Sequence, residues 1–271
     1  MTAPSEVLRK VTAVRYLTPL RSGGSVPGVV EADDLGTYVV KFTGSAQGRK
    51  ALVAEVIVGE LARQLGLRVR ELVLVHFDPS VAEEEPHQEV QDLLRASAGL
   101  NLGMDYLPGA ADFTPDALAV DPAESARIIW LDAFTANVDR TVHSANLMTW
   151  PTSGHQEPRL WLIDHGAALV FHHRWDTAAE AVERAYDFRY HALGSRRPDV
   201  AAADAELAHR VTPELLRAVV AAVPDEWLAG EPGFATPDAL REAYVAHLTS
   251  RARASARWLP KGFPGSERPV G

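Results

Sequence analysis

The sequence contains no cysteine, which excludes disulfide bonds and thiolate chemistry. It has no signal-like N-terminus and no apolar run approaching the roughly 18 residues of a membrane span. Positive charge is scarce, since 27 Lys and Arg stand against 36 Asp and Glu for a net charge of −9. This balance disfavours non-specific binding to nucleic acid or to an anionic membrane. The absences together predict a cytoplasmic protein that binds neither nucleic acid nor a membrane.

Lysine is also rare, with only four in 271 residues, and one of them lies in an apolar strand. Lys41 is in the predicted strand 37–42, between Val40 and Phe42. One interpretation is a phosphate-binding lysine, a compact point charge on a rigid strand. The other is an edge-strand lysine whose ammonium group reaches water. The strand alone does not separate the two.

The first third of the chain is predicted to be rich in β-strands. Short alternating or apolar segments bounded by turns predict strands at 11–16, 29–32, 37–42, 71–77 and 101–107. Residues 21–28 form a glycine-rich turn, and a helix is predicted from about residue 50 to 65, ending at Gly66. Glu55 and Glu60 are five apart on this helix, roughly 140° around its axis, so only one can face the lysine strand.

The rest of the chain is predicted to be mainly helical. Three helix starts share a cap residue, a proline and an acidic residue: Asp121-Pro122-Ala123-Glu124, Thr212-Pro213-Glu214 and Thr236-Pro237-Asp238. The last helix should run to about residue 258. Two short strands are predicted at 147–150 and 160–163, joined by a polar loop. The change of character near residue 108 divides the chain into an N-lobe, 1–108, and a C-lobe, 109–271.

Polar side chains gather at one end of the two short strands. Asp139 and Asn146 precede the first strand, and Asp164 follows the second. Each alone is an ordinary turn residue. Phosphoryl transfer, however, needs a carboxylate near the acceptor hydroxyl, oxygen ligands for magnesium and a cation on the phosphates. The order of glycine loop, strand lysine, helix glutamate and this hairpin therefore favours a kinase.

This order resembles the protein-kinase-like superfamily, and the Asn-x-Asp-Arg and Asp-His-Gly forms look closest to the HipA-like kinases and their phosphatidylinositol-kinase relatives. The segments similar to a compact bacterial branch of HipA-family kinases are 23–32, 38–42, 54–55, 61–67, 102–107 and 137–140. The resemblance covers roughly residues 17–168. It implies an α+β, two-lobed protein-kinase-like fold, with a β-rich N-lobe and a mainly helical C-lobe. It also implies ATP and magnesium as cofactors.

Roles carry over from the family residue by residue. Lys41 would bind the α- and β-phosphates and Glu55 would orient it, since Glu55 precedes the Leu-Ala-x-x-x-Gly-Leu stretch as in the family. Asp139 would position the acceptor hydroxyl or accept its proton, and Asn146 and Asp164 would hold magnesium. The remaining nucleotide contacts would come from the glycine loop and the adenine hinge: Gly23, Gly24, Ser25, Met104, Asp105, Tyr106 and Leu107.

Two departures from the family pattern stand out. Asn146 lies seven residues after Asp139, where five is usual, and His143 lies between them. Either the loop carries a two-residue bulge or another group holds the metal. The chain also has no room for the extra N-terminal domain of toxin-type HipA proteins, so a toxin role is not expected.

The sequence favours an active kinase that phosphorylates a hydroxyl of a protein Ser or Thr or of a small metabolite. One alternative is a pseudokinase that binds nucleotide without transfer, and another is transfer of AMP on the same fold. Arg140 either binds a phosphate or pairs with a carboxylate. A zinc site is conceivable among five histidines, but metal-facing or structural roles are expected for them: His143, His155, His165, His172 and His173.

Overall fold

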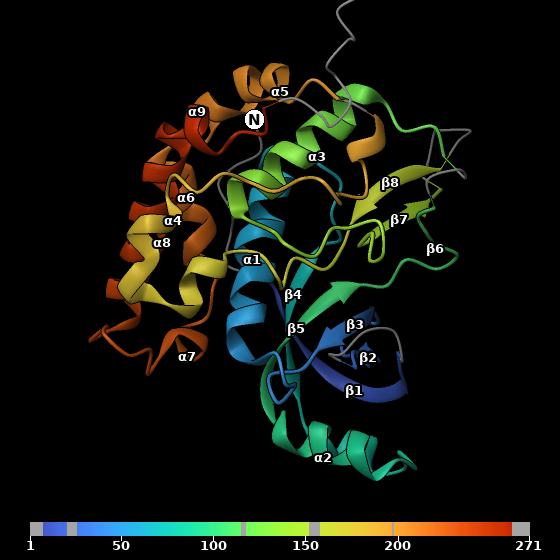
Figure 1. Ribbon diagram of the computed structural model, residues 1–271. Coiled ribbons are helices and arrows are strands. Elements are labelled where there is room, and N and C mark those ends of the chain that lie inside the picture. The colour runs from blue at the N-terminus through green and yellow to red at the C-terminus, as the bar shows by residue number, and fades with distance from the viewer. Residues whose placement is uncertain (1–7, 21–25, 115–117, 152–157, 197, 262–271) are drawn as a thin grey trace, which may run out of the picture.

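The computed structural model describes residues 8–20, 26–114, 118–151, 158–196 and 198–261. Figure 1 shows a small β-barrel at the bottom of the view and a larger, mainly helical part above it and to its left. The last strand of the barrel ends at residue 105. Residues from 106 onward are called the C-terminal part below. This arrangement confirms the predicted α+β fold, with strands first and helices after them.

Five strands close the barrel in the order β1-β2-β3-β5-β4. Their bounds are β1 Lys10–Pro19, β2 Gly28–Ala32, β3 Thr37–Lys41, β4 Leu72–Phe77 and β5 Gly99–Asp105. All pairs are antiparallel except β1 with β4, which are parallel. The strands match the prediction. The sequence analysis predicts a hairpin-like sheet, whereas the structure has a closed barrel, because β1 also pairs with β4.

The barrel interior is a compact apolar cluster of its own. Val40, Val73 and Phe77 belong to it and are almost completely buried. On β5 the place of an inward side chain is taken by Gly103, where an added Cβ would lie 2.5 Å from Val75 Cγ2. Glycine is therefore required there, because any side chain would collide with the facing strand.

Helix α1, Gly48–Gln64, connects the barrel to the C-terminal part. Its residues 51–62 are all buried, which fits its nearly unbroken apolar sequence. The helix packs against β4 and against two helices from the other end of the chain, α6 (Pro213–Ala221) and α7 (Asp225–Leu228). One apolar cluster consequently runs from α1 through the C-terminal part.

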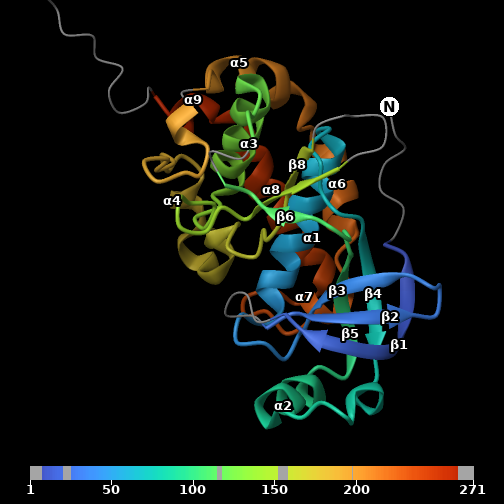
Figure 2. The same cartoon turned by 90° about the vertical axis from the view of Figure 1, so that its right-hand side faces the viewer.

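A polar stretch between β4 and β5 contains a helix that the sequence analysis does not predict. It forms a 3₁₀ turn, Pro79–Ala82, and then α2, Gln88–Ala96, in which only Leu94 is buried. Figure 2 shows α2 lying apart from the other helices, at the foot of the barrel. The helix is short and amphipathic, and Val90, Leu93 and Leu94 turn toward the barrel cluster.

The three predicted helix starts are confirmed. Asp121 accepts a hydrogen bond from Ala123 N (3.0 Å) at the start of α3, Pro122–Thr135. Thr212 and Thr236 cap α6 and α8 (Pro237–Arg253) in the same way. Helix α8 ends five residues earlier than predicted, and a separate turn, α9 (Ser255–Trp258), follows it.

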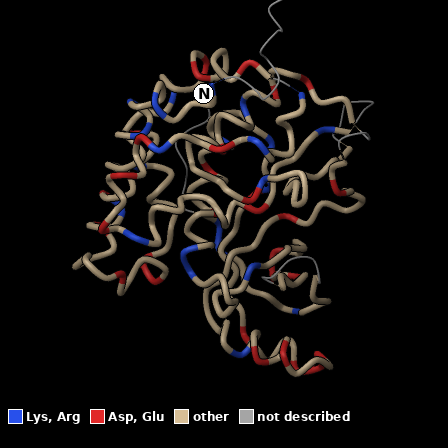
Figure 3. Tube along the Cα trace, in the orientation of Figure 1, with Lys and Arg blue, Asp and Glu red and all other residues tan. Residues whose placement is uncertain are grey.

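The remaining elements complete the C-terminal part. A three-stranded sheet consists of β6 (Ala111–Asp112), which is not predicted, β7 (Leu147–Trp150) and β8 (Arg159–Leu162). The short helices are α4 (Ala178–Ala181) and α5 (Val200–Leu207), with 3₁₀ turns at Val170–His173, Trp175–Thr177, Gly194–Arg196 and Ala208–Arg210. Acidic and basic residues are interleaved over both parts (Figure 3). None of the helices in the described residues has the length and apolar character needed to cross a bilayer.

Candidate active site

Lys41, at the end of β3, is buried at the centre of an ionic cluster. Its ammonium group donates to Glu55 of α1 and to Asp164 Oδ1 (2.8 Å), which follows β8. Burial alone would lower the pKa of Lys41, but the two carboxylates outweigh it and raise the pKa. The interpretation of Lys41 as an edge-strand lysine reaching water is therefore wrong.

Glu55 is the glutamate that faces the lysine strand. Its Oε1 accepts from Lys41 and from the backbone N–H groups of His165 and Gly166 (2.9 Å each). Burial would raise the pKa of Glu55, but Lys41 and these donors lower it. Glu60, in contrast, pairs with Arg63 on its own helix (3.3 Å). One carboxylate thus joins α1, β3 and the loop that carries Asp164.

The hairpin β7–β8 brings the predicted residues Asn146 and Asp139 to the end at which Asp164 lies. Leu147 pairs with Leu162, and Ile163 N donates to Asn146 O (3.1 Å). The Asn146 side-chain amide donates to the backbone oxygen and to Oδ2 of Asp139 (3.0 Å each). Asn146 and Asp164 both have left-handed backbones, with φ of +48° and +53°. Such conformations are uncommon outside glycine and concentrate at functional sites.

The seven-residue step from Asp139 to Asn146 is accommodated by a tight turn. Thr141 N donates to Ser144 O (2.8 Å), and Thr141 Oγ1 accepts from the N–H groups of His143 and Ser144. The extra residues project as this turn, with His143 exposed. The chain therefore returns to place Asn146 beside Asp139.

A buried network fixes both loops from behind. Asp132, on α3, accepts from Arg140 Nε (2.7 Å) and Asn137 Nδ2 (2.9 Å), and its Oδ2 lies 3.0 Å from His191 Nε2. Arg140 also donates to Asn146 O and to Ile163 O (3.1 Å). Of the two roles considered for Arg140, binding a phosphate and pairing with a carboxylate, the structure shows the second.

Strong electrostatic effects accompany this burial. Burial would raise the pKa of Asp132, but Arg140 and His191 lower it to about 2. Burial and the charge of Arg140 lower the pKa of His165 to about 3, so its ring is neutral and lies 3.2 Å from Arg140. Sequence reasoning missed Asp132 and His191. A single acid inside an otherwise apolar stretch of α3 is the only signal that could have indicated Asp132.

A cavity of about 300 Å³ adjoins the ionic cluster, and Lys41 and Asp164 line it. Three of the four predicted hinge residues line it as well, namely Met104, Tyr106 and Leu107, whereas Asp105 does not. Arg70, which the sequence analysis does not single out, is a further lining residue and donates to Met104 Sδ (3.5 Å). Burial lowers the pKa of Arg70.

Some predicted residues lie outside the part of the chain that the structure describes. Gly23, Gly24 and Ser25, the proposed glycine loop, lie outside the described residues, as does His155. His172 contacts the Tyr244 hydroxyl through Nδ1 (2.9 Å), and His165 contacts Arg140. In the described ranges no three His, Asp or Glu side chains converge so that they could hold a metal ion by themselves.

Comparisons with known proteins identify the family and the fold. A family model described as HipA-like kinase matches residues 14–259. The structure is similar to that of the Helicobacter pylori proinflammatory kinase CtkA, with a TM-score of 0.55 and 11% identity over 93% of this chain and 95% of that one. The Golgi casein kinase matches at a TM-score of 0.48 and 12% identity, over 92% of this chain and 75% of that one, and the fold assignment does not rest on it. No curated protein matches the sequence.

Proposed function

The chain belongs to the HipA-like kinase family of phosphotransferases, and we propose that it transfers the γ-phosphoryl group of ATP, with magnesium, to a hydroxyl group. The acceptor would be a Ser or Thr of a protein or a small metabolite. The observation that carries the proposal is the contact of Lys41 with both Glu55 and Asp164, next to a cavity, with Asp139 held by Asn146 at the same end of the hairpin.

We propose that the nucleotide lies in the 300 Å³ cavity between the barrel and the C-terminal part. Its base would contact the segment of Met104, Asp105, Tyr106 and Leu107. Lys41 would bind the α- and β-phosphates, with Glu55 holding it in position. Gly23, Gly24 and Ser25 would add backbone N–H groups to the phosphates. The site would then separate an N-lobe, 1–108, from a C-lobe, 109–271.

The residues at the hairpin end have the chemistry to hold magnesium. Asp164 offers a carboxylate and Asn146 an amide oxygen, and magnesium in such sites takes one or two protein oxygens together with phosphate oxygens. These two residues would hold the metal, which when bound neutralises charge on the phosphates.

Asp139 would act on the acceptor. Its side chain is exposed, and the Asn146 amide fixes one carboxylate oxygen. A carboxylate held in this way can orient the acceptor hydroxyl and accept its proton as the phosphoryl group moves. The network around Asp132 and Arg140 would keep this loop in place.

The test is a transfer assay with intact-mass analysis, comparing wild type with Asp139→Asn. We expect magnesium-dependent transfer by the wild type, as autophosphorylation or ATP hydrolysis, and a loss of about 100-fold or more in the variant. Asp92→Asn, an exposed position on α2, is the matched control and should retain full activity. A wild-type protein that binds no ATP with magnesium would refute the proposal.

The same assay distinguishes the two alternatives. A pseudokinase would show a nucleotide-dependent rise in melting temperature but no modified product. Transfer of AMP would give a product with a different added mass from that of a phosphate.

A further inference from the structure

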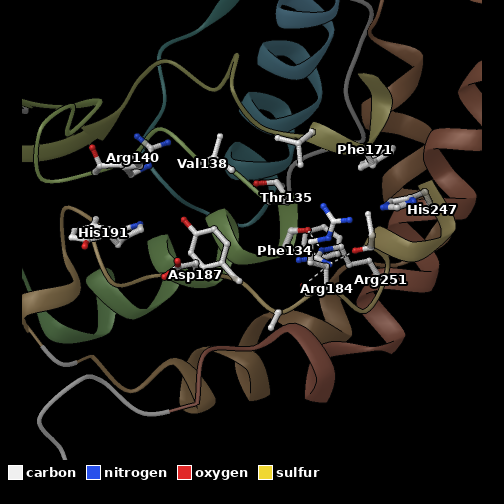
Figure 4. Close-up of a pocket in the computed structure, with 17 residues that line it drawn as sticks. Phe134, Thr135, Val138, Arg140, Phe171, Arg184, Asp187, His191, His247 and Arg251 are labelled. Carbon is white, nitrogen blue, oxygen red and sulfur yellow. Dashed lines mark hydrogen bonds between the residues drawn. The ribbon is translucent and has the colours of Figure 1, made fainter. Parts of the chain in front are cut away.

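A second and larger cavity, of about 400 Å³, lies inside the C-terminal part (Figure 4). Its wall comes from the end of α3, the loop of Val138, the segment after Asp164 and the helix α8. Among the described residues it shares no lining residue with the first cavity. Phe134, Val170 and Phe171 make much of its surface apolar. A large apolar cavity with a few polar groups is typical of a small-molecule site.

This cavity adjoins the loop that carries the proposed base. Val138 and Arg140, the neighbours of Asp139 on either side, both line it. Tyr186, from the opposite wall, donates its hydroxyl to Asn137 O (2.8 Å). The first cavity, in contrast, is lined by Asp164 and Lys41. Residues on both sides of Asp139 in the sequence thus line the second cavity, and neither of them lines the first.

The wall of the second cavity carries positive charge with no matching negative charge. Buried Arg251 donates only to backbone carbonyls, those of residues 133, 134, 181, 182 and 184. Burial and then the charge of Arg184 lower the pKa of Arg251 to about 10, so it remains charged at neutral pH. Arg184 makes no ion pair with any residue that the structure describes, and Figure 4 shows it beside Arg251.

The other charged residues of this wall are already neutralised. Asp187, the one carboxylate among the described lining residues, binds Arg189 through both oxygens (2.9 and 2.6 Å). Arg140 pairs with Asp132. In a chain of net charge −9, this wall is thus locally positive. An anionic ligand matches it, since surface charge attracts its opposite.

A buried histidine adds a second polar feature. His247 stacks on Phe171, with ring centroids 3.6 Å apart, and is 7% exposed. Burial and then the charge of Arg251 lower its pKa to about 4, so the ring is neutral. Its Nε2 atom has no hydrogen-bond partner within the described residues. A buried polar atom without a partner is unfavourable.

We propose that this cavity holds the acceptor of the transfer, and that the acceptor is a small hydroxy acid with an apolar body. The inference rests on the proposed function. The apolar body would pack against Val170 and Phe171, and the carboxylate would face Arg184. A cavity of about 150 Å³ is known to admit benzene, so this one has room for a ring and a short chain.

The reaction balances with groups already named. The acceptor hydroxyl oxygen forms a bond to the γ-phosphorus, and the bond from that phosphorus to the β,γ-bridging oxygen breaks. ADP leaves with the bridging oxygen, and the hydroxyl proton passes to the Asp139 carboxylate. The products are ADP and the phosphate ester of the hydroxy acid.

The probe for the test is 3-phenyllactate, which combines an aryl body, an alcohol and a carboxylate. Three relatives each lack one of these groups: lactate, 3-phenylpropanoate and 3-phenyllactamide. Binding is measured by calorimetry on the full chain with ADP and magnesium present, and transfer by mass analysis with ATP. We expect 3-phenyllactate and 3-phenylpropanoate to bind about tenfold or more tightly than lactate and the amide. 3-Phenyllactate should gain a phosphate, lactate and the amide should do so less efficiently, and 3-phenylpropanoate, which has no hydroxyl, should gain none.

Two variants locate the binding. Arg184→Gln should reduce the preference for the acid over the amide about tenfold, whereas Arg217→Gln, an exposed arginine of α6, should leave it unchanged. Ala185→Trp places a large side chain at an exposed position of the cavity wall and should abolish probe binding. ADP affinity in the first cavity checks that both variants are folded.

The outcomes separate this inference from the proposed function. If ADP binds with magnesium but no member of the series binds, or if the amide binds as tightly as the acid, the inference is wrong and the proposed function stands. Binding without transfer, in a protein that phosphorylates itself or another protein, also overturns it. Failure to bind ADP in the first place would instead refute the proposed function.

Discussion

Two buried ionic clusters lie close together in this protein, and they use their hydrogen bonds differently. Around Lys41, the Asp164 carboxylate is one-third exposed and borders a cavity. Around Asp132, both partners of the Asp132–Arg140 pair have side chains that are 0% exposed. In the second cluster the carboxylate accepts from three side chains, and the guanidinium also binds two backbone oxygens.

The difference shows how a fold can hold reactive groups in position. The Asp132–Arg140 pair is sealed from water, although Arg140 and His191 border the second cavity. Arg140 also fixes backbone at the start of β7 and at the end of β8. The cluster of Lys41 keeps one side open to the cavity, where ligands could join it. We expect changes in the cluster of Asp132 to alter stability and changes in the cluster of Lys41 to alter chemistry.

The largest effect should come from Asp132→Asn. The change leaves the buried Arg140 without its counter-ion, and breaking a buried pair costs about 3–5 kcal/mol of unfolding free energy. Urea unfolding measures it. Asp92→Asn, which breaks an exposed pair with Arg95, should cost below about 1 kcal/mol. Equal costs for the two variants would contradict the sealed character of this cluster.

Next in size is Lys41→Met, which tests the open cluster. We expect turnover to fall about 100- to 1,000-fold, as when one preorganised donor to a developing charge is removed. Kinetics with saturating ATP and magnesium measure it, and Lys10→Met, an exposed strand lysine, is the matched control. If Lys41→Met lowered stability but left turnover intact, the two clusters would have the same role.

The smallest effect concerns pH and His165. Its pKa is about 3 in the folded protein, against about 6.5 in the unfolded chain, so between these values the unfolded chain binds one more proton. Stability from this residue is therefore complete above about pH 6.5 and falls by about 1.4 kcal/mol for each unit below it. In unfolding measured from pH 7 to 5, the free energy of unfolding of His165→Asn should depend less steeply on pH, by about that slope. Parallel curves would show that His165 is not held neutral.

Much of this fold could be predicted from local sequence signals. The capped helix starts at Asp121, Thr212 and Thr236 carry their own chemistry, and the structure has all three. Closure of the barrel could not be predicted, because pairing of β1 with β4 joins segments about 60 residues apart without a turn between them. Helix α2 was not predicted because it is a short helix within a stretch rich in polar residues.

The part of the candidate site that depends on residue type and order could be predicted from the sequence. Lys41, Glu55 and Asp164 are brought into contact, and Asn146 returns to Asp139 despite the longer loop. The supporting residues were not predictable, because His191 reaches Asp132 from 59 positions away and no motif marks it. The second cavity likewise depends on how α8 packs against the end of α3.

Helix α1 ties the barrel to the C-terminal part. It shares its apolar contacts with α6 and α7, and its Glu55 receives two backbone N–H groups from the loop after β8. The apolar cluster of α1 also contains Val39, Leu72 and Leu102 of the barrel, so the barrel shares this core in addition to its own interior. If β3 moved away from α1, the link from Lys41 to Glu55 would have to lengthen. A pair of labels on β3 and α1 would thus work as a gauge of opening.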